Sequence, residues 1–137
     1  MKKFLFFFLL ILLLLGTGIT YYRIQMPVPS LEKEKADYIF SAEELFAIYT
    51  ADEVSSNDRF LDKLIQVSGK VKELSAEGNQ LSVILDGGEL SGGIICELDP
   101  RFRDQLILPK QGQAVTMKGV CSGMLLDVVL VRCVLIA

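Results

Sequence analysis

The sequence contains no histidine and no block of basic residues. Without histidine, the chain lacks the commonest metal ligand and the side chain that most often acts as a general base near neutral pH. After residue 23 there are 11 basic residues against 17 acidic ones, a formal net charge of −6 that is spread along the chain. Because nucleic-acid binding depends on clustered Lys and Arg that face phosphates, this composition disfavours a nucleic-acid-binding protein.

The N-terminus carries the longest apolar stretch. Phe4–Tyr22 is a run of 19 residues without a charge, and Lys2 and Lys3 precede it. As a helix this run would be about 28 Å long, close to the roughly 30 Å thickness of the hydrocarbon core of a bilayer. The two lysines favour a cytoplasmic N-terminus. We therefore expect residues 1–22 to be a single-pass signal anchor in the cytoplasmic membrane, with the remainder periplasmic or extracellular.

Two interpretations of this segment remain open. Tyr21 and Tyr22 would lie in the interfacial belt of an uncleaved anchor. Gly16 and Gly18 would instead occupy the −3 and −1 positions of a cleaved signal peptide. A lipoprotein is disfavoured, because the first cysteine of the chain is Cys96 and none follows the apolar run directly.

The sequence predicts a linker at residues 23–39 and one domain at 40–137, which opens with a helix. Ser41 has the position of an N-cap, and Glu44, three residues later, completes a capping box. The polar run 55–58 predicts a break or a second cap in this helical region.

The rest of the domain alternates apolar and polar residues with a period of two, which is typical of half-buried strands. The alternation predicts five strands at 64–73, 81–85, 94–98, 114–121 and 127–136, with Lys118 facing outward. Gly69 lies within the first strand, where we expect a bend. Asp99 and Pro100 predict the start of a short helix between the third and fourth strands, with a buried stripe of Phe102, Leu106 and Ile107. This order predicts a mainly β protein, the five-stranded Greek-key barrel of the OB-fold.

Several short motifs, in this order and at this spacing, resemble the tRNA_anti-like family, a bacterial group of OB-fold domains. They are Ala42–Leu45, Asp52–Val54, Val67–Val71, Ile94–Cys96, Gly119–Gly123 and Asp127–Leu130, and the resemblance covers about residues 40–136. Asp52 and Phe60 depart from the family pattern, which usually has Asn and Tyr there. The resemblance implies an exported or membrane-tethered OB-fold and does not imply tRNA binding. We expect structural roles for Ser41, Glu44, Gly69 and Gly119.

The three cysteines, Cys96, Cys121 and Cys133, share strand faces with apolar residues. Their spacing does not fit a zinc site, and no histidine could complete one. A Cys121–Cys133 disulfide is disfavoured, because a hairpin would place Cys121 opposite Val128, roughly 17 Å from Cys133. Strands three and five are neighbours in an OB-fold, so Cys96 and Cys133 are the better pair. Three core thiols, or one Cys96–Cys133 disulfide, both remain open.

We find no catalytic constellation, no metal site and no cofactor signature in the sequence. The predicted strands carry no aromatic residue on which bases could stack. We therefore expect a non-catalytic binding module for a protein, peptide or glycan ligand, tethered by its N-terminal helix. The alternatives are an accessory subunit of an envelope enzyme and an OB domain that binds nucleic acid or oligosaccharide. Nucleic-acid binding would depend first on Lys70, Lys72, Lys118 and Arg132.

Overall fold

The computed structural model describes residues 1–25, 31–88, 91–101 and 107–136. Helix α1 covers Lys2–Gln25. Its stretch Lys2–Arg23 is long and apolar enough to cross a membrane, a test that a signal sequence near the N-terminus also passes. The described side chains of α1, residues 2–23, are exposed and are not covered by the other described residues.

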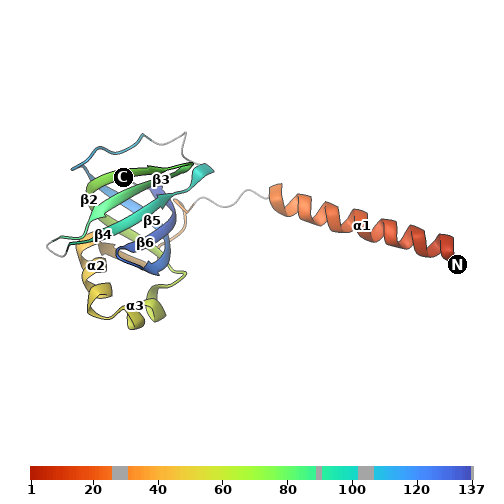
Figure 1. The fold of residues 1–137 in the computed structure, drawn as a ribbon, viewed down its shortest axis with the longest axis horizontal. Coiled ribbons are helices and arrows are strands. Elements are labelled where there is room, and N and C mark those ends of the chain that lie inside the picture. Colours follow the sequence, from red (N-terminus) through yellow and green to blue (C-terminus); the bar gives the residue numbers. More distant parts are fainter. Residues whose placement is uncertain (26–30, 89–90, 102–106, 137) are drawn as a thin grey trace.

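A closed barrel forms the body of the protein (Figure 1). Its strands are β2 (Leu64–Glu77), β3 (Gln80–Asp86), β4 (Gly93–Leu98), β5 (Ala114–Met124) and β6 (Val128–Leu135). They pair in the order β2-β3-β4-β6-β5, and β5 pairs again with β2 to close the barrel. The β4–β6 pair is parallel and the other pairs are antiparallel. This is the OB-fold topology, and the five predicted strands are confirmed.

Strand β2 closes the barrel because its two halves have different partners. Residues 64–70 pair with β5, whereas residues 71–77 pair with β3. The register shifts between Val71 and Glu73, so the irregularity lies after Gly69 rather than at it. A Cβ on Gly69 would lie 2.9 Å from the Cβ of Ala42 and 3.6 Å from that of Leu85. Gly69 is therefore required by the close approach of the helix that begins at Ala42.

One strand was not expected. Strand β1 (Tyr38–Ser41) pairs in parallel with β2, with Tyr38 opposite Ile65 and Ser41 opposite Ser68. The linker predicted for residues 23–39 is therefore wrong at its end, because Tyr38 and Ile39 belong to the sheet. The rings of Tyr38 and Phe40 both pack edge-on against Phe60, with centroids 4.9 Å and 5.5 Å away.

Two helices follow β1 and cover one end of the barrel (Figure 1). Helix α2 (Ala42–Ala51) has the predicted capping box, because the Ser41 hydroxyl accepts from the Glu44 N–H while the Glu44 carboxylate accepts from the Ser41 N–H. Asp52 ends α2 and is also the N-cap of α3 (Glu53–Phe60). The break therefore comes at Asp52, earlier than residues 55–58, because its carboxylate accepts from the Ser55 N–H.

The barrel interior is apolar and continuous with the helices. The apolar faces predicted for the strands are buried, and α2 and α3 add Leu45, Phe46, Tyr49 and Phe60 to the same cluster. Of the short helix predicted after Asp99, the described part is a 3₁₀ turn at Pro100 and Arg101. Phe102 and Leu106 of its predicted stripe lie outside the described residues, and Ile107 of that stripe is 90% exposed rather than buried.

Residues 31–37, here called the strap, lie against the outside of the barrel. Leu31 packs with Leu64 and Val134 in a small cluster separate from the main core. The Lys118 ammonium group donates to the carbonyls of Glu32 and Glu34, at 3.1 Å and 2.7 Å. Lys118 does point away from the barrel interior, but the prediction of an outward side chain in water is wrong, since the strap leaves it only 6% exposed.

Candidate binding groove

The three cysteines are buried free thiols. Cys96 and Cys133 lie side by side, and burial, followed by the neighbouring Cys96 thiol, raises the pKa of Cys133. A Cβ on Gly119 would lie 2.4 Å from the Cys133 sulfur, which accounts for the glycine there. Cys96 and Cys133 are thiols in this structure but close neighbours, and their disulfide stays a prediction for oxidising conditions. Cys121 pairs with Leu130 rather than Val128, so its register differs by two residues from the expected one.

Cys121 contacts a buried tyrosine. Its sulfur and the Tyr49 hydroxyl are 3.1 Å apart, between β5 and α2. Burial, reinforced by this hydrogen bond, raises the pKa of Tyr49 well above its ordinary value. Because Tyr49 is only 1% exposed and Cys121 is fully buried, neither group is placed to meet a substrate, and the pair has a structural role.

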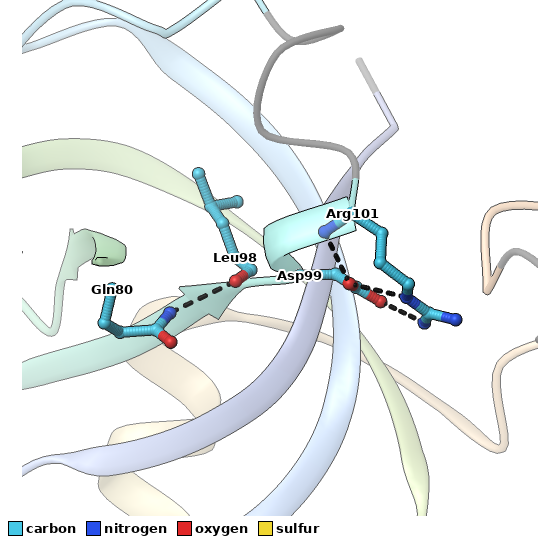
Figure 2. Close-up of polar contacts among 4 residues, drawn as sticks. All are labelled: Gln80, Leu98, Asp99 and Arg101. Carbon is cyan, nitrogen blue, oxygen red and sulfur yellow. Dashed lines mark hydrogen bonds and ion pairs between the residues drawn. The ribbon is translucent and has the colours of Figure 1, made fainter. Parts of the chain in front are cut away.

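Asp99 also has a structural role. Its carboxylate accepts hydrogen bonds from the backbone and guanidinium N–H groups of Arg101, as Figure 2 shows. These bonds, chiefly those from the side chain, lower the pKa of Asp99. In the same view the Gln80 amide donates to the Leu98 carbonyl at 3.1 Å and joins the ends of β3 and β4. This cluster fixes the turn that follows β4.

The basic residues named above as candidates for nucleic-acid binding are scattered. Lys118 is covered by the strap, and Lys72 is exposed on β2. Lys70 lines a hollow of about 470 Å³ that also contains Glu43 and Asp86. Arg132, in a left-handed conformation at φ 53°, contributes to lowering the pKa of Asp99. They therefore do not form a basic track.

A groove of about 440 Å³ lies between the end of α3 and the outer face of β4, β5 and β6. It is lined by nine residues: Asn57, Leu61, Glu97, Ser122, Gly123, Met124, Leu125, Val129 and Val131. Val129 continues into an apolar row across three strands, because it pairs with Ile95 and Ile95 pairs with Ile84. All three side chains lie on the outer face and are half-buried.

The hairpin loop between β5 and β6 forms one rim of this groove. Leu125 and Leu126 are 87% and 88% exposed there. Two adjacent exposed leucines are unusual at a strand connection, where polar residues normally lie. Leu125 and Leu126 therefore indicate a candidate binding surface, and we did not identify them from the sequence.

Two polar groups of the groove have no partner among the described residues. The Oδ1 atom of Asn57 is buried without a hydrogen bond, beside Gly123, whose φ of 104° brings its backbone close to α3. Glu97 is half-buried on the outer face of β4, and its carboxylate makes no hydrogen bond or ion pair within the described chain. No aromatic or basic side chain is among the described lining residues. The described lining of the groove is therefore largely apolar, with unpartnered hydrogen-bond acceptors and no cation.

The tRNA_anti-like family model matches residues 1–135, and the chain belongs to this family. A crystal structure of a lipoprotein from Klebsiella pneumoniae, described as a candidate nucleic acid-binding protein, is similar with a TM-score of 0.59 and 11% identity. The similarity covers 72% of this chain and 91% of that one. It confirms the OB-fold.

Two other solved structures are more distant. The OBody AM3L09 bound to hen egg-white lysozyme has a TM-score of 0.44 and 11% identity, over 56% of this chain and 84% of that one. A candidate aspartyl-tRNA synthetase from Leishmania major has a TM-score of 0.46 and 13% identity, over 88% of this chain and 25% of that one. No curated protein sequence matches the chain.

Proposed function

We propose that this protein is a non-catalytic binding module, tethered by α1 to the outer side of the cytoplasmic membrane, that holds a protein segment in the groove. The observation that carries this proposal is the apolar groove with its exposed rim of Leu125 and Leu126. Exposed apolar surface beside a concave site is typical of protein-interaction surfaces.

Membrane tethering is supported by α1, whose apolar length suits one membrane crossing and whose described side chains are left exposed. A binding role rather than catalysis is supported by the titratable groups. Glu97 is the single ionisable side chain among the described lining residues of the groove. General acid–base or nucleophilic catalysis normally requires two cooperating groups within reach of a substrate.

Site-specific photocrosslinking in cells tests the proposal. We expect a photoreactive residue at position 125 or 129 of the full-length chain to yield a discrete adduct. The same residue at position 77, on the exposed end of β2, should not yield it. The double variant Leu125→Ser/Leu126→Ser should reduce the adduct formed at position 129 by about tenfold, because it removes exposed apolar contact area. Equal adducts from positions 77 and 129, or none from the groove, would contradict the proposal.

The same cells test the tether. The full-length chain should stay with the membrane fraction after alkaline carbonate extraction. A soluble form that begins at Ile19 would show instead that the N-terminal segment is a cleaved signal peptide.

Nucleic-acid binding is the second candidate, and the description of the Klebsiella lipoprotein is the observation that favours it. OB-folds that hold single strands combine stacking aromatic side chains with a basic groove. Neither is present among the described residues that line this groove. We therefore favour a protein partner.

A further inference from the structure

Two unpartnered acceptors, the buried Oδ1 atom of Asn57 and the carboxylate of Glu97, give the groove a preference for a cationic hydrogen-bond donor. Resting on the proposed function, we infer that the groove takes an extended partner segment in which one arginine or lysine is flanked by apolar side chains. The cation would meet Glu97, and the flanking side chains would cover the apolar wall.

Glu97 supplies the charge for this preference. It is half-buried between the buried residues Cys96 and Leu98 and has no partner within the described chain. The basic side chains near this end of β4 already act on another group, because Arg101 is bonded to Asp99 and the charge of Arg132 also acts on Asp99. Among the described residues the carboxylate of Glu97 is therefore left without a cation, and a bound partner could supply one.

Asn57 adds a second acceptor at the same groove. Its buried Oδ1 has no donor, and buried polar atoms are nearly always hydrogen-bonded in native proteins. A guanidinium group carries five N–H donors and no acceptor, and an ammonium group carries three. A phosphate or carboxylate would bring only further acceptors to a groove whose two unpartnered groups, Asn57 Oδ1 and the Glu97 carboxylate, are both acceptors. The unmatched hydrogen-bonding capacity therefore favours a cationic group.

The shape of the groove suits the rest of such a segment. Val129, Val131 and Leu61 line the wall next to the acceptors. Arginine and lysine have long aliphatic stems that pack along apolar surface while the charged end reaches a polar partner. The volume of about 440 Å³ accommodates one such side chain with a neighbour, within the usual range for ligand sites.

The test uses the full-length protein in nanodiscs of zwitterionic lipid and three fluorescent nine-residue peptides. Each peptide alternates valine and serine around a central residue, which is arginine, citrulline or glutamate. Citrulline has nearly the shape of arginine without its charge. We expect the arginine peptide to bind at least about tenfold more tightly than the citrulline peptide in a fluorescence anisotropy titration, because a desolvated charge pair is lost.

Two variants at position 97 connect this preference to Glu97. Glu97→Gln should remove the difference between the arginine and citrulline peptides, and Glu97→Lys should reverse the order so that the glutamate peptide binds best. A matched control, Glu77→Gln on the exposed end of β2, should leave all three affinities unchanged. Thermal melts of each variant establish that the barrel is intact.

The outcomes separate this inference from the proposed function. Equal binding of the arginine and citrulline peptides, or an unchanged preference in Glu97→Gln, would overturn the inference. If the arginine and citrulline peptides bound equally, and Leu125→Ser/Leu126→Ser abolished the binding of both, the groove would still be a binding site but without a preference for a cation. Binding by none of the three peptides would overturn the inference as well, and the crosslinks from position 129 would then decide whether the groove has a partner.

Discussion

At the scale of single residues, two glycines show how closely the elements of this barrel approach one another. Gly69 lies against Ala42 at the start of α2, and Gly119 lies against the sulfur of Cys133. Both have backbone conformations open to any residue, because neither has a positive φ. Space, and not backbone freedom, therefore requires glycine at these two positions.

Gly69→Val is expected to destabilise the domain. A Cβ at this position would lie 2.9 Å from the Cβ of Ala42, which real Cβ contacts essentially never reach. The helix or the strand must shift, at a cost of about 1–3 kcal/mol. Urea unfolding of the full-length chain measures this free energy. The control Lys72→Val places the same side chain at an exposed site of the same strand and should change stability by roughly 0.5 kcal/mol or less. Equal effects of the two variants would show that α2 is not held against Gly69.

Two buried groups predict a loss of stability at alkaline pH. The pKa values of Tyr49 and Cys133 are raised in the folded state, mainly by burial. Their unfolded values are about 10 and 8.5, so the unfolded chain releases these protons first. The contribution of these two groups to the free energy of unfolding is complete below about pH 8.5. It is lost as the pH rises, by about 1.4 kcal/mol per pH unit for each group above its unfolded pKa.

Urea unfolding at pH 7, 9 and 10.5 measures this dependence. Tyr49→Phe lacks the hydroxyl that bonds to Cys121, so it should be less stable than the natural chain at pH 7. Its stability should then fall less between pH 9 and 10.5. Parallel losses in the two proteins would show that Tyr49 does not contribute to the alkaline instability.

At the scale of elements, the five barrel strands were predictable because their apolar residues alternate with a period of two. Strand β1 was not, because Tyr38–Ser41 is four residues long and its pairing partner in β2 lies far along the chain. The helix break was placed late because Asp52 can both end one helix and cap the next. The formation of β1 and the position of the helix break depend on tertiary contacts, which the local sequence does not specify.

The strap illustrates the same limit. Leu31 precedes the charged run 32–35, a pattern that predicts a solvated spacer. In the structure, Leu31 is 8% exposed and the backbone carbonyls of that run accept from Lys118. The charged side chains contribute nothing to these bonds, so the pattern of side chains did not indicate them.

Lys118→Ala is expected to release the strap. It removes two hydrogen bonds from a charged donor, each worth about 1.5–3 kcal/mol, so the strap should open more often. Lys33 and Lys35 lie on the strap, so limited digestion with trypsin reports this opening. We expect cleavage after these lysines to be at least about tenfold faster in the variant. Lys70→Ala, at an exposed position outside the strap, is the control. Unchanged rates in Lys118→Ala would show that the packing of Leu31 and the two hydrogen bonds between Asp37 and Leu64 hold the strap without Lys118.

At the scale of the whole molecule, the strap determines how far the barrel can lie from α1. Only residues 26–30 separate Gln25 from Leu31, and the chain between those two residues spans at most about 22 Å at roughly 3.6 Å per step. If α1 is the proposed anchor, the barrel stays close to the bilayer surface. The two ends of β6 would then differ in their distance from the bilayer. Val134, near one end, packs with Leu31 of the strap, whereas Val129, toward the other end, lines the groove.

The candidate groove was only partly predictable. The sequence indicated an OB-fold without a catalytic set and without aromatic residues on the five predicted barrel strands, which disfavours base stacking on those strands. It did not indicate that Asn57 and Glu97, from a helix and a strand 40 residues apart, line one groove. The position of α3 against the β5–β6 hairpin depends on packing that no local pattern encodes.

Nucleic acid is a ligand to test directly, because the family name contains tRNA and the similar Klebsiella lipoprotein is described as a candidate nucleic acid-binding protein. Base stacking on aromatic side chains contributes about 1–3 kcal/mol per base, and phosphate contacts supply most of the remaining affinity. Strand β1 does add Tyr38 and Phe40, but these rings pack against Phe60 and are half-buried. The chain after residue 23 carries a formal charge of −6, and Lys118 is covered by the strap.

We therefore expect the full-length protein in nanodiscs of zwitterionic lipid to show no saturable binding to single-stranded DNA, RNA or tRNA at about 150 mM salt. Fluorescence anisotropy measures this, with empty nanodiscs as the control. Micromolar binding that weakens steeply with added salt would contradict the prediction, because a linear fall of log affinity with log salt counts the phosphates neutralised by the protein. Lys70→Ala, Lys72→Ala and Arg132→Ala would then identify the basic residues responsible. Lys118→Ala would show whether Lys118, which the strap covers, also contributes to the binding.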